Sequence, residues 1–128
     1  MSSTYKDLIV WQRAIDLVEI IYRLTLRFSP DERYGLISQL RRAAVSIASN
    51  IAEGQGRMSA GEFRQFVGHA RGSTLEVETQ LIISTRLGLA TAEQCATALD
   101  LCDRIKRMLH GLAISLDEKE PAVAGSKN

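Results

Sequence analysis

The chain has 128 residues, the length of one domain with a single sizeable core. Hydrophobic residues make up 45% and charged residues 24%, as in ordinary globular proteins, and alternating runs typical of strands are few. The net charge of +1 provides no general basic field, which argues against binding of nucleic acid over the whole surface.

The sequence shows no sign of export or membrane insertion. The N-terminus lacks a basic region followed by an apolar core, and charged residues interrupt the apolar runs well short of a membrane span. Cys95 and Cys102 lie on one predicted helix, about 10 Å apart along its axis, too far for a disulfide. We therefore expect a cytoplasmic protein with no membrane partner, in which both cysteines are small core residues.

Two helices are predicted in the first half of the chain. Residues 7–27 carry apolar side chains at three- and four-residue steps, with polar side chains on the opposite stripe. The second helix is predicted over residues 30–53, because Ser29 can cap it and Glu32 is placed to complete a capping box. Gly54 is predicted to end this helix in a left-handed conformation.

Two more helices are predicted over residues 60–88 and 92–116. Ser59 and Thr91 begin capping boxes, each followed three residues later by Glu or Gln. Residues 117–128 are polar, contain proline and glycine and lack an apolar period, so they are predicted to form a disordered tail.

Four helices with short connections predict an all-α fold, an antiparallel up-down-up-down four-helix bundle over residues 1–116. A hairpin of two helices exchanged between subunits is the structural alternative. The sequence contains no internal repeat or low-complexity block.

The helix predicted over residues 30–53 has a second apolar face, opposite its core face at about 100° per residue. This face consists of Ile37, Arg41, Val45, Ala48 and Ala52. A helix in an isolated bundle needs one apolar face, so we expect the second to be buried against another subunit, with Arg41 paired across the contact. The alternative is that the alanines are present only as good helix formers.

Glycines on the third predicted helix support the same interpretation. Gly61, Gly68 and Gly72 lie near one face, away from the core seam. Glycine inside a helix costs about 0.5–1 kcal/mol relative to alanine, so we expect a gain from the close approach of a neighbouring helix. Tolerated glycines on a solvated face are the alternative.

A polar cluster is predicted around the turn between the second and third helices. It comprises Arg42, Asn50, Glu53, Gly54 and Arg57. Glu53 lies at a helix C-terminus, where the helix dipole disfavours a negative charge by a few tenths to about 1 kcal/mol. A cation such as Arg57 or Arg42 would offset this cost, so the predicted role is structural. The Gly-Gln-Gly run lacks the strand and the lysine of a phosphate loop.

The sequence contains no recognisable catalytic or metal-binding constellation. His69 and His110 are isolated, and no pairing of a nucleophile with a base follows from the residue order. We therefore expect no enzymatic activity, no metal and no cofactor.

Basic residues form modest clusters on the third and fourth predicted helices. They are Arg64, Arg71, Arg104, Lys106 and Arg107. Carboxylates are interleaved with them, which favours a solvated surface of ion pairs. Repeated around an oligomer, these residues would form a continuous basic track that could contact RNA or DNA.

A combined motif runs through the first three predicted helices. It comprises Leu8-x-x-Trp11-x-x-Ala14, then Tyr34-Gly35-Leu36-x-x-Gln39-Leu40-Arg41-Arg42-Ala43-Ala44, then Ser46-Ile47-x-x-Asn50-Ile51-Ala52-Glu53-Gly54-x-Gly56-Arg57. It continues through Ser59, Glu62-Phe63, Gly72-Ser73, Glu76-x-Glu78-x-Gln80-Leu81 and Leu87-Gly88. With this motif the chain resembles the bacterial four-helix-bundle family named after proteins encoded in intervening sequences of 23S rRNA genes. The last predicted helix, over residues 92–116, matches this family only in its general residue pattern and not in specific motif residues.

The resemblance implies a bundle that assembles into a homopentameric ring or barrel, and it implies no known enzymatic activity. Relatives include the accessory variability protein of diversity-generating retroelements, which is strongly basic and associates with nucleic acid and a reverse transcriptase. This chain departs from that relative in its near-neutral charge. We therefore expect a self-assembling scaffold that presents a surface to a protein partner. An RNA- or DNA-binding accessory protein is the alternative.

Overall fold

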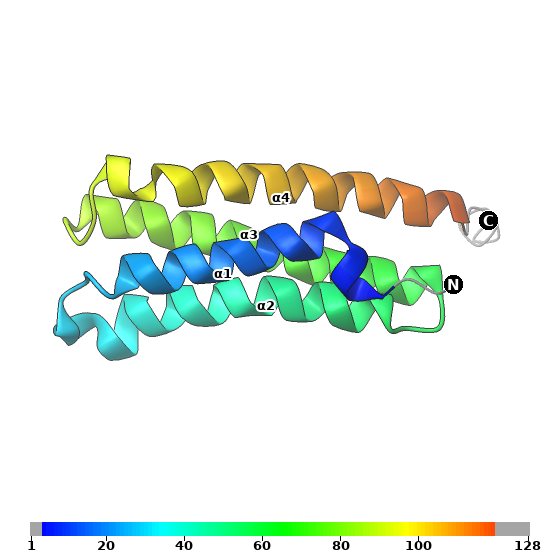
Figure 1. The fold of residues 1–128 in the computed structure, drawn as a ribbon, viewed down its shortest axis with the longest axis horizontal. Coiled ribbons are helices and arrows are strands. Elements are labelled where there is room, and N and C mark those ends of the chain that lie inside the picture. The colour runs from blue at the N-terminus through cyan, green and yellow to red at the C-terminus, as the bar shows by residue number, and fades with distance from the viewer. Residues whose placement is uncertain (1–3, 120–128) are drawn as a thin grey trace, which may run out of the picture.

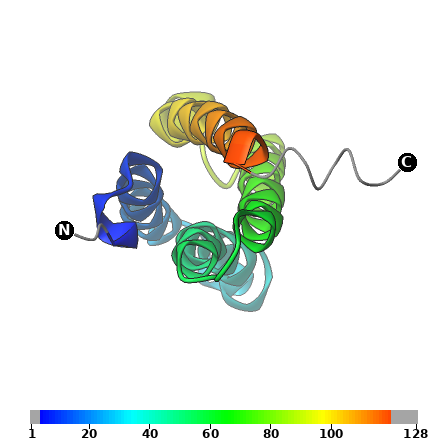
Figure 2. The same ribbon diagram turned by 90° about the vertical axis from the view of Figure 1, so that its right-hand side faces the viewer.

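The structure is a computed structural model that describes residues 4–119, and within that range it is helical without strands. Its α-helices run back and forth along one long axis (Figure 1) and are α1 Ile9–Thr25, α2 Ser38–Gln55, α3 Ala60–Arg86 and α4 Ala92–Lys119. Viewed along that axis, they follow one another around a common centre (Figure 2). The predicted all-α four-helix bundle is confirmed. No helix in this range has an apolar stretch long enough to cross a membrane.

The core fills the centre of the bundle with aliphatic side chains and cysteines from all the α-helices. Among its fully buried members are Leu17, Ile21, Leu40, Ile47, Ile51, Val77, Leu81, Cys95, Ile105 and Leu109. Cys95 and Cys102 are buried and unbridged, as predicted. Helix α2 packs most extensively against α3, whereas α1 and α4 have the least extensive contact of the neighbouring pairs. The interface between α2 and α3 is therefore the largest contact between neighbouring helices in the bundle.

The predicted starts of the last two helices are confirmed by their caps. The hydroxyl of Ser59 accepts a hydrogen bond from the backbone N–H of Glu62 at 3.1 Å. The Thr91 hydroxyl accepts from the N–H of Gln94 at 3.0 Å, and Gln94 Oε1 accepts from the N–H of Thr91 at 2.9 Å. These bonds satisfy helical N–H groups that have no partner within the helix.

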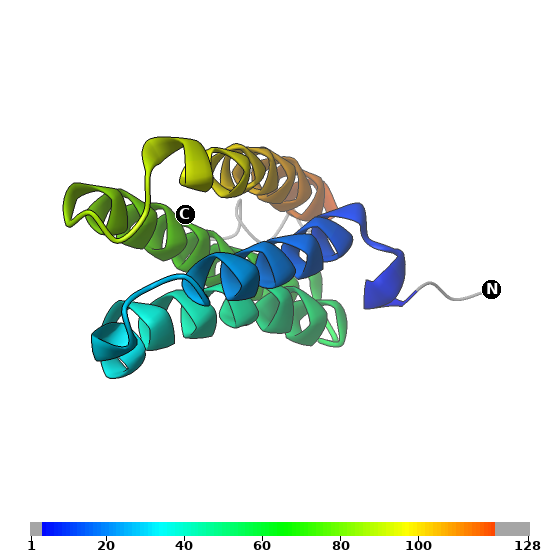
Figure 3. The same cartoon turned by 60° about the vertical axis from the view of Figure 1, so that its left-hand side comes forward.

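Helix α2 begins later than predicted, because a turn tighter than an α-helix and then a wider one precede it. Pro30–Glu32 form a 3-10 turn and Arg33–Ile37 a π-helical turn. The break lies at Gly35, whose φ of −106° and ψ of −115° are not helical. The Glu32 carboxylate accepts from the N–H of Leu36 at 3.4 Å, so it caps this turn and not the one that starts at Pro30. Figure 3 shows this connection and the α3–α4 connection at the same end of the bundle.

The prediction that Gly54 ends α2 in a left-handed conformation is wrong. The helix continues to Gln55, and among the described residues only Gly88 has a positive φ, of 78°. Gly54 is buried because α3 passes close to it: a Cβ atom there would lie 2.7 Å from Phe63 Cδ1 and 2.9 Å from Phe66 Cβ. The absence of a side chain therefore permits the close packing of α2 and α3.

The outer ends of the bundle also differ from the predicted boundaries. Helix α1 is preceded by a short 3-10 turn, Tyr5–Asp7, so its regular part is shorter than expected. Helix α4 extends to Lys119, and an ion pair between Arg64 and Asp117 joins its last turns to α3. The first residues of the predicted tail are thus helical, and residues 120–128 lie outside the described range.

Candidate functional site

Most of the second apolar face of α2 is covered within the chain. Of the five residues predicted to join subunits, Ala48 is buried and Ile37, Arg41 and Ala52 are half-buried. Val45 is the most open, with 41% of its surface exposed. One residue of this face is thus well placed to meet another subunit, and the interface stays a prediction.

Arg41 has its partners on α1 of the same chain. Its Nε donates to Thr25 Oγ1 at 2.9 Å, and its Nη2 donates to the carbonyl oxygen of Tyr22 at 3.4 Å. The guanidinium also stacks 4.4 Å from the centre of the Tyr22 ring, a cation–π contact. Arg41 therefore ties α2 to α1, and its position among small residues needs no second subunit.

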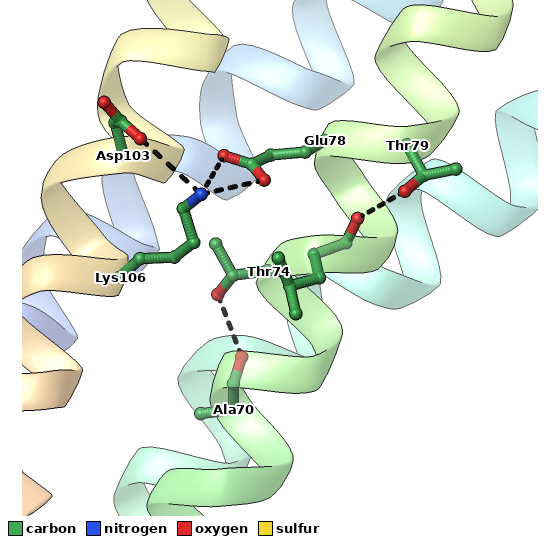
Figure 4. Close-up of polar contacts among 7 residues, drawn as sticks. Ala70, Thr74, Glu78, Thr79, Asp103 and Lys106 are labelled. Atoms are coloured by element: carbon green, nitrogen blue, oxygen red, sulfur yellow. Dashed lines mark hydrogen bonds and ion pairs between the residues drawn. The ribbon is translucent and has the colours of Figure 1, made fainter.

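Between Gly68 and Ile82, helix α3 presents an uncharged face to solvent, opposite its buried seam, and the exposed Arg64 and Arg86 lie on the same side one turn beyond each end. This outward face of α3 consists of Gly68, Gly72, Leu75, Thr79 and Ile82. Leu75 and Ile82 are 39% and 49% exposed, and a Cβ atom at Gly68 or Gly72 would meet no atom within 4 Å. The Thr79 hydroxyl donates to the carbonyl oxygen of Leu75 at 2.8 Å (Figure 4). The expected close approach to these two glycines is therefore not made within residues 4–119.

The predicted cluster at the α2–α3 turn divides into two parts. Glu53 pairs with Arg57 at 3.5 Å, as expected for a carboxylate at a helix end, and the Arg57 guanidinium lies 4.6 Å from the centre of the Phe66 ring. Asn50 lies one turn earlier, and its amide donates to the carbonyl oxygen and the hydroxyl of Ser46 at 2.8 and 2.9 Å. Because Glu53 and Arg57 are exposed, their ion pair stabilises the turn by at most about 1 kcal/mol.

A polar groove runs between α2 and α3, and we call it the α2–α3 groove. It has a volume of about 470 Å³ and is lined by Gln39, Arg42, Ala43, Ser46, Glu76 and Gln80. Hydrogen bonds hold its walls together: the hydroxyl oxygens of Ser46 and Ser73 are 2.9 Å apart, and Gln80 Nε2 donates to Gln39 Oε1 at 3.4 Å. All the lining residues belong to the motif that carries the family resemblance.

Three polar groups in this groove lack a strong partner. Gln80 is only 7% exposed, yet its Oε1 is enclosed and accepts no hydrogen bond. Arg42 has a single long hydrogen bond, 3.4 Å, to the Ser38 hydroxyl on its own helix. Glu76 forms no hydrogen bond or ion pair within the described residues. Sequence reasoning missed Gln39, Glu76 and Gln80 as site residues, although their helical spacing could have placed them on facing polar stripes.

Two of the five residues predicted to contact nucleic acid are paired within the chain. Arg64 is joined to Asp117. Lys106 Nζ lies 2.9 Å from Glu78 Oε2 and 3.5 Å from Asp103 Oδ1 (Figure 4). The carboxylates compete with phosphate for both cations, so these residues are poor candidates for a nucleic-acid contact.

The other three basic residues lie in two separate hollows. Arg71 and Arg107 line a hollow of about 350 Å³ between α3 and α4, together with Asp103, Lys106 and His110. Neither arginine forms an ion pair within residues 4–119. Arg104 faces a hollow between α1 and α4, where acidic residues such as Asp100 balance the arginines. The predicted basic patch is therefore reduced to Arg71 and Arg107.

The Lys106–Glu78 pair lies beside the buried thiol of Cys102. The hydrogen bond that Lys106 Nζ donates to the Glu78 carboxylate raises the pKa of Lys106. Burial, and then the charge of Glu78, raises the pKa of the Cys102 thiol from 9.0 to about 12. The thiol is therefore protonated at neutral pH and is a weak nucleophile. Within residues 4–119 no group of three His, Cys, Asp or Glu side chains is arranged to hold a metal ion.

The fold and the motif together define a small all-helical bundle protein with a polar groove on its α2–α3 side. The sequence model of the family described as 23S rRNA-intervening sequence protein matches residues 6–111. The protein therefore belongs to this family.

A solved structure has the same fold as this chain. It is the crystal structure of a protein with unknown function from the S23 ribosomal protein family of Bacteroides thetaiotaomicron VPI-5482. It shares 20% sequence identity with this chain and has a TM-score of 0.73, over 81% of this chain and 97% of that chain. A comparison with curated proteins found no match.

Proposed function

We propose that the protein is a non-enzymatic, self-assembling module whose copies join through the outward face of α3. The observation that carries this proposal is the combination of exposed Leu75 and Ile82 with open glycines on one uncharged surface. Burying apolar surface between copies yields about 25 cal/mol for each Å² removed from water, and the stretch of this face from Gly68 to Ile82 carries no charged group that would have to be desolvated.

The glycines of α3 support a helix as the neighbour. Gly68 and Gly72 each cost about 0.5–1 kcal/mol in a helix, and no side chain of the described chain uses the space that they leave. A helix of a second copy gains from that space, because its backbone can approach α3 more closely there. The resemblance to the family favours a ring of five copies, whose remaining polar surface is available to a protein partner.

The Leu75→Glu variant tests the assembly. We expect the unmodified protein to have a mass of about five times its protomer mass of 14.2 kDa in light scattering, and the variant to have the protomer mass. A carboxylate in the centre of an apolar contact would be buried without a partner. The matched control is Leu26→Glu, which changes another exposed leucine, 77% exposed and outside this face. A monomeric unmodified protein at micromolar concentration would contradict the proposal.

A second candidate function is the binding of RNA or DNA, and the hollow between α3 and α4 favours it. Arg71 and Arg107 face this hollow from two helices without an ion-pair partner within residues 4–119, and the carboxylate that also lines it, Asp103, is paired with Lys106. In an oligomer the hollow recurs once in each copy, which brings several weak phosphate contacts onto one strand.

The double variant Arg71→Glu, Arg107→Glu tests this candidate. If phosphates bind in the hollow, fluorescence anisotropy with mixed RNA and DNA oligonucleotides will show at least about tenfold weaker binding and a shallower dependence on salt. The Arg27→Glu variant, on the other side of the bundle, is the control. Absence of binding by the unmodified protein at low salt would exclude the function.

A further inference from the structure

The starting point is a buried hydrogen-bond acceptor without a donor. Gln80 Oε1 is enclosed at the α2–α3 groove, and the amide of the same side chain is already engaged with Gln39 at 3.4 Å. Buried acceptors in proteins are almost always satisfied, so an unsatisfied acceptor on a residue that lines a groove indicates a donor from outside the chain, a water or a ligand. The terminal torsion of glutamine is soft, so a small rotation brings this oxygen to a donor in the groove.

Two opposite charges flank that acceptor without pairing to each other. Glu76 is one helical turn from Gln80 on α3, and Arg42 is one turn from Gln39 on α2. The register in which α2 and α3 pack brings Gln39 to Gln80, and both charged residues line the same groove. No ion pair joins Arg42 to Glu76 within 4.0 Å, and the groove lies between their helices. It thus offers one cation, one anion and one unused neutral acceptor.

From this arrangement we propose that the α2–α3 groove binds a small zwitterion, a molecule with an ammonium and a carboxylate group a few bonds apart, of the amino-acid type. The carboxylate accepts from the guanidinium of Arg42, and the ammonium donates to Gln80 Oε1 and to Glu76. Arginine pairs well with carboxylates because its N–H groups form a planar fork.

Simpler occupants fit these groups less well. Water can donate to Gln80 and hydrate the exposed Arg42 and Glu76, but it pairs with neither charge. A simple anion pairs with Arg42 but is repelled by Glu76. A simple cation pairs with Glu76 but is repelled by Arg42. The groove volume of about 470 Å³ leaves room for a molecule of several non-hydrogen atoms. None of its lining residues belongs to the outward face of α3, so binding is independent of the self-assembly proposed above.

A titration followed by NMR of the full-length protein tests the proposal. The probes are glycine, β-alanine and γ-aminobutyrate, which differ only in the spacing of their two charges. We expect at least one of them to shift the side-chain amide signals of Gln80 and the Nε signal of Arg42 saturably, with a dissociation constant in the millimolar range. Glycine betaine has both charges but no N–H donor, so it should produce no saturable shift.

Variants at exposed positions complete the test. Glu76→Gln and Arg42→Gln should each weaken binding at least about tenfold, because each removes a charge-assisted hydrogen bond. Glu19→Gln on α1 changes an exposed carboxylate outside the groove and should leave the affinity unchanged. The proposal is overturned if no probe gives a saturable shift up to about 50 mM. It is also overturned if glycine betaine binds equally well, or if Glu76→Gln binds like the unmodified protein.

Discussion

Replacing Gly54 with valine is expected to destabilise the bundle by about 3 kcal/mol, a large fraction of the stability of a small domain. The added atoms have no space, because a Cβ at this position would already lie 2.7 Å from Phe63 Cδ1 and 2.9 Å from Phe66 Cβ. The Phe63 ring can rotate away. The Cβ of Phe66 is fixed to the backbone of α3, so relief there requires the two helices to separate.

Urea unfolding followed by circular dichroism measures this effect, and two other glycines serve as controls. A Cβ at Gly56 would lie 3.6 Å from the nearest atom, an ordinary contact, so Gly56→Ala should change the stability little. Gly72 is exposed and open, so Gly72→Ala in a monomeric Leu75→Glu background should stabilise the helix by about 0.5–1 kcal/mol. If Gly54→Val were as stable as the unmodified protein, the close packing of α2 and α3 at Gly54 would be contradicted.

Gly54 also shows where the sequence stops being informative about the fold. The apolar periods and the capping residues Ser59 and Thr91 predict the helices and two of their starts, because these signals are local. A glycine after a glutamate near a helix end can have two roles. It can end the helix in a left-handed conformation, or it can let a neighbouring helix approach closely. The choice depends on Phe63 and Phe66, which belong to the next helix. Their position opposite Gly54 follows from tertiary packing.

The same limit applies to the candidate site. The angular position of Arg41 on α2 was predictable, but the helix that covers it was not, since helical periodicity does not say which neighbour lies against a face. The groove poses a similar problem. Gln39 and Gln80 are far apart in the sequence and meet only because α2 and α3 pack antiparallel in one register. Only the register in which α2 and α3 pack joins the polar residues of the two helices into a groove.

Raising the pH from about 9 to about 12 is expected to lower the stability through Cys102. Burial and the charge of Glu78 disfavour the thiolate and raise the pKa of this thiol from an ordinary 9.0 to about 12 in the folded protein. Between these values the unfolded chain loses a proton that the native state retains. Stability therefore falls by about 1.4 kcal/mol for each pH unit in this window. Lys106 acts in the same direction, since its raised pKa makes its contribution disappear as the pH rises above its ordinary value near 10.5.

Urea unfolding of the Cys102→Ala variant at a series of pH values isolates this contribution. Near neutral pH we expect the variant to be about 1 kcal/mol less stable, because a small buried side chain is truncated. Its stability should then fall less steeply than that of the unmodified protein above about pH 9, so that the two curves converge or cross. Every other titratable side chain is common to both proteins, so the difference between the curves reports Cys102. Parallel curves across this range would show that the thiol is not held protonated beside Glu78 in the native bundle.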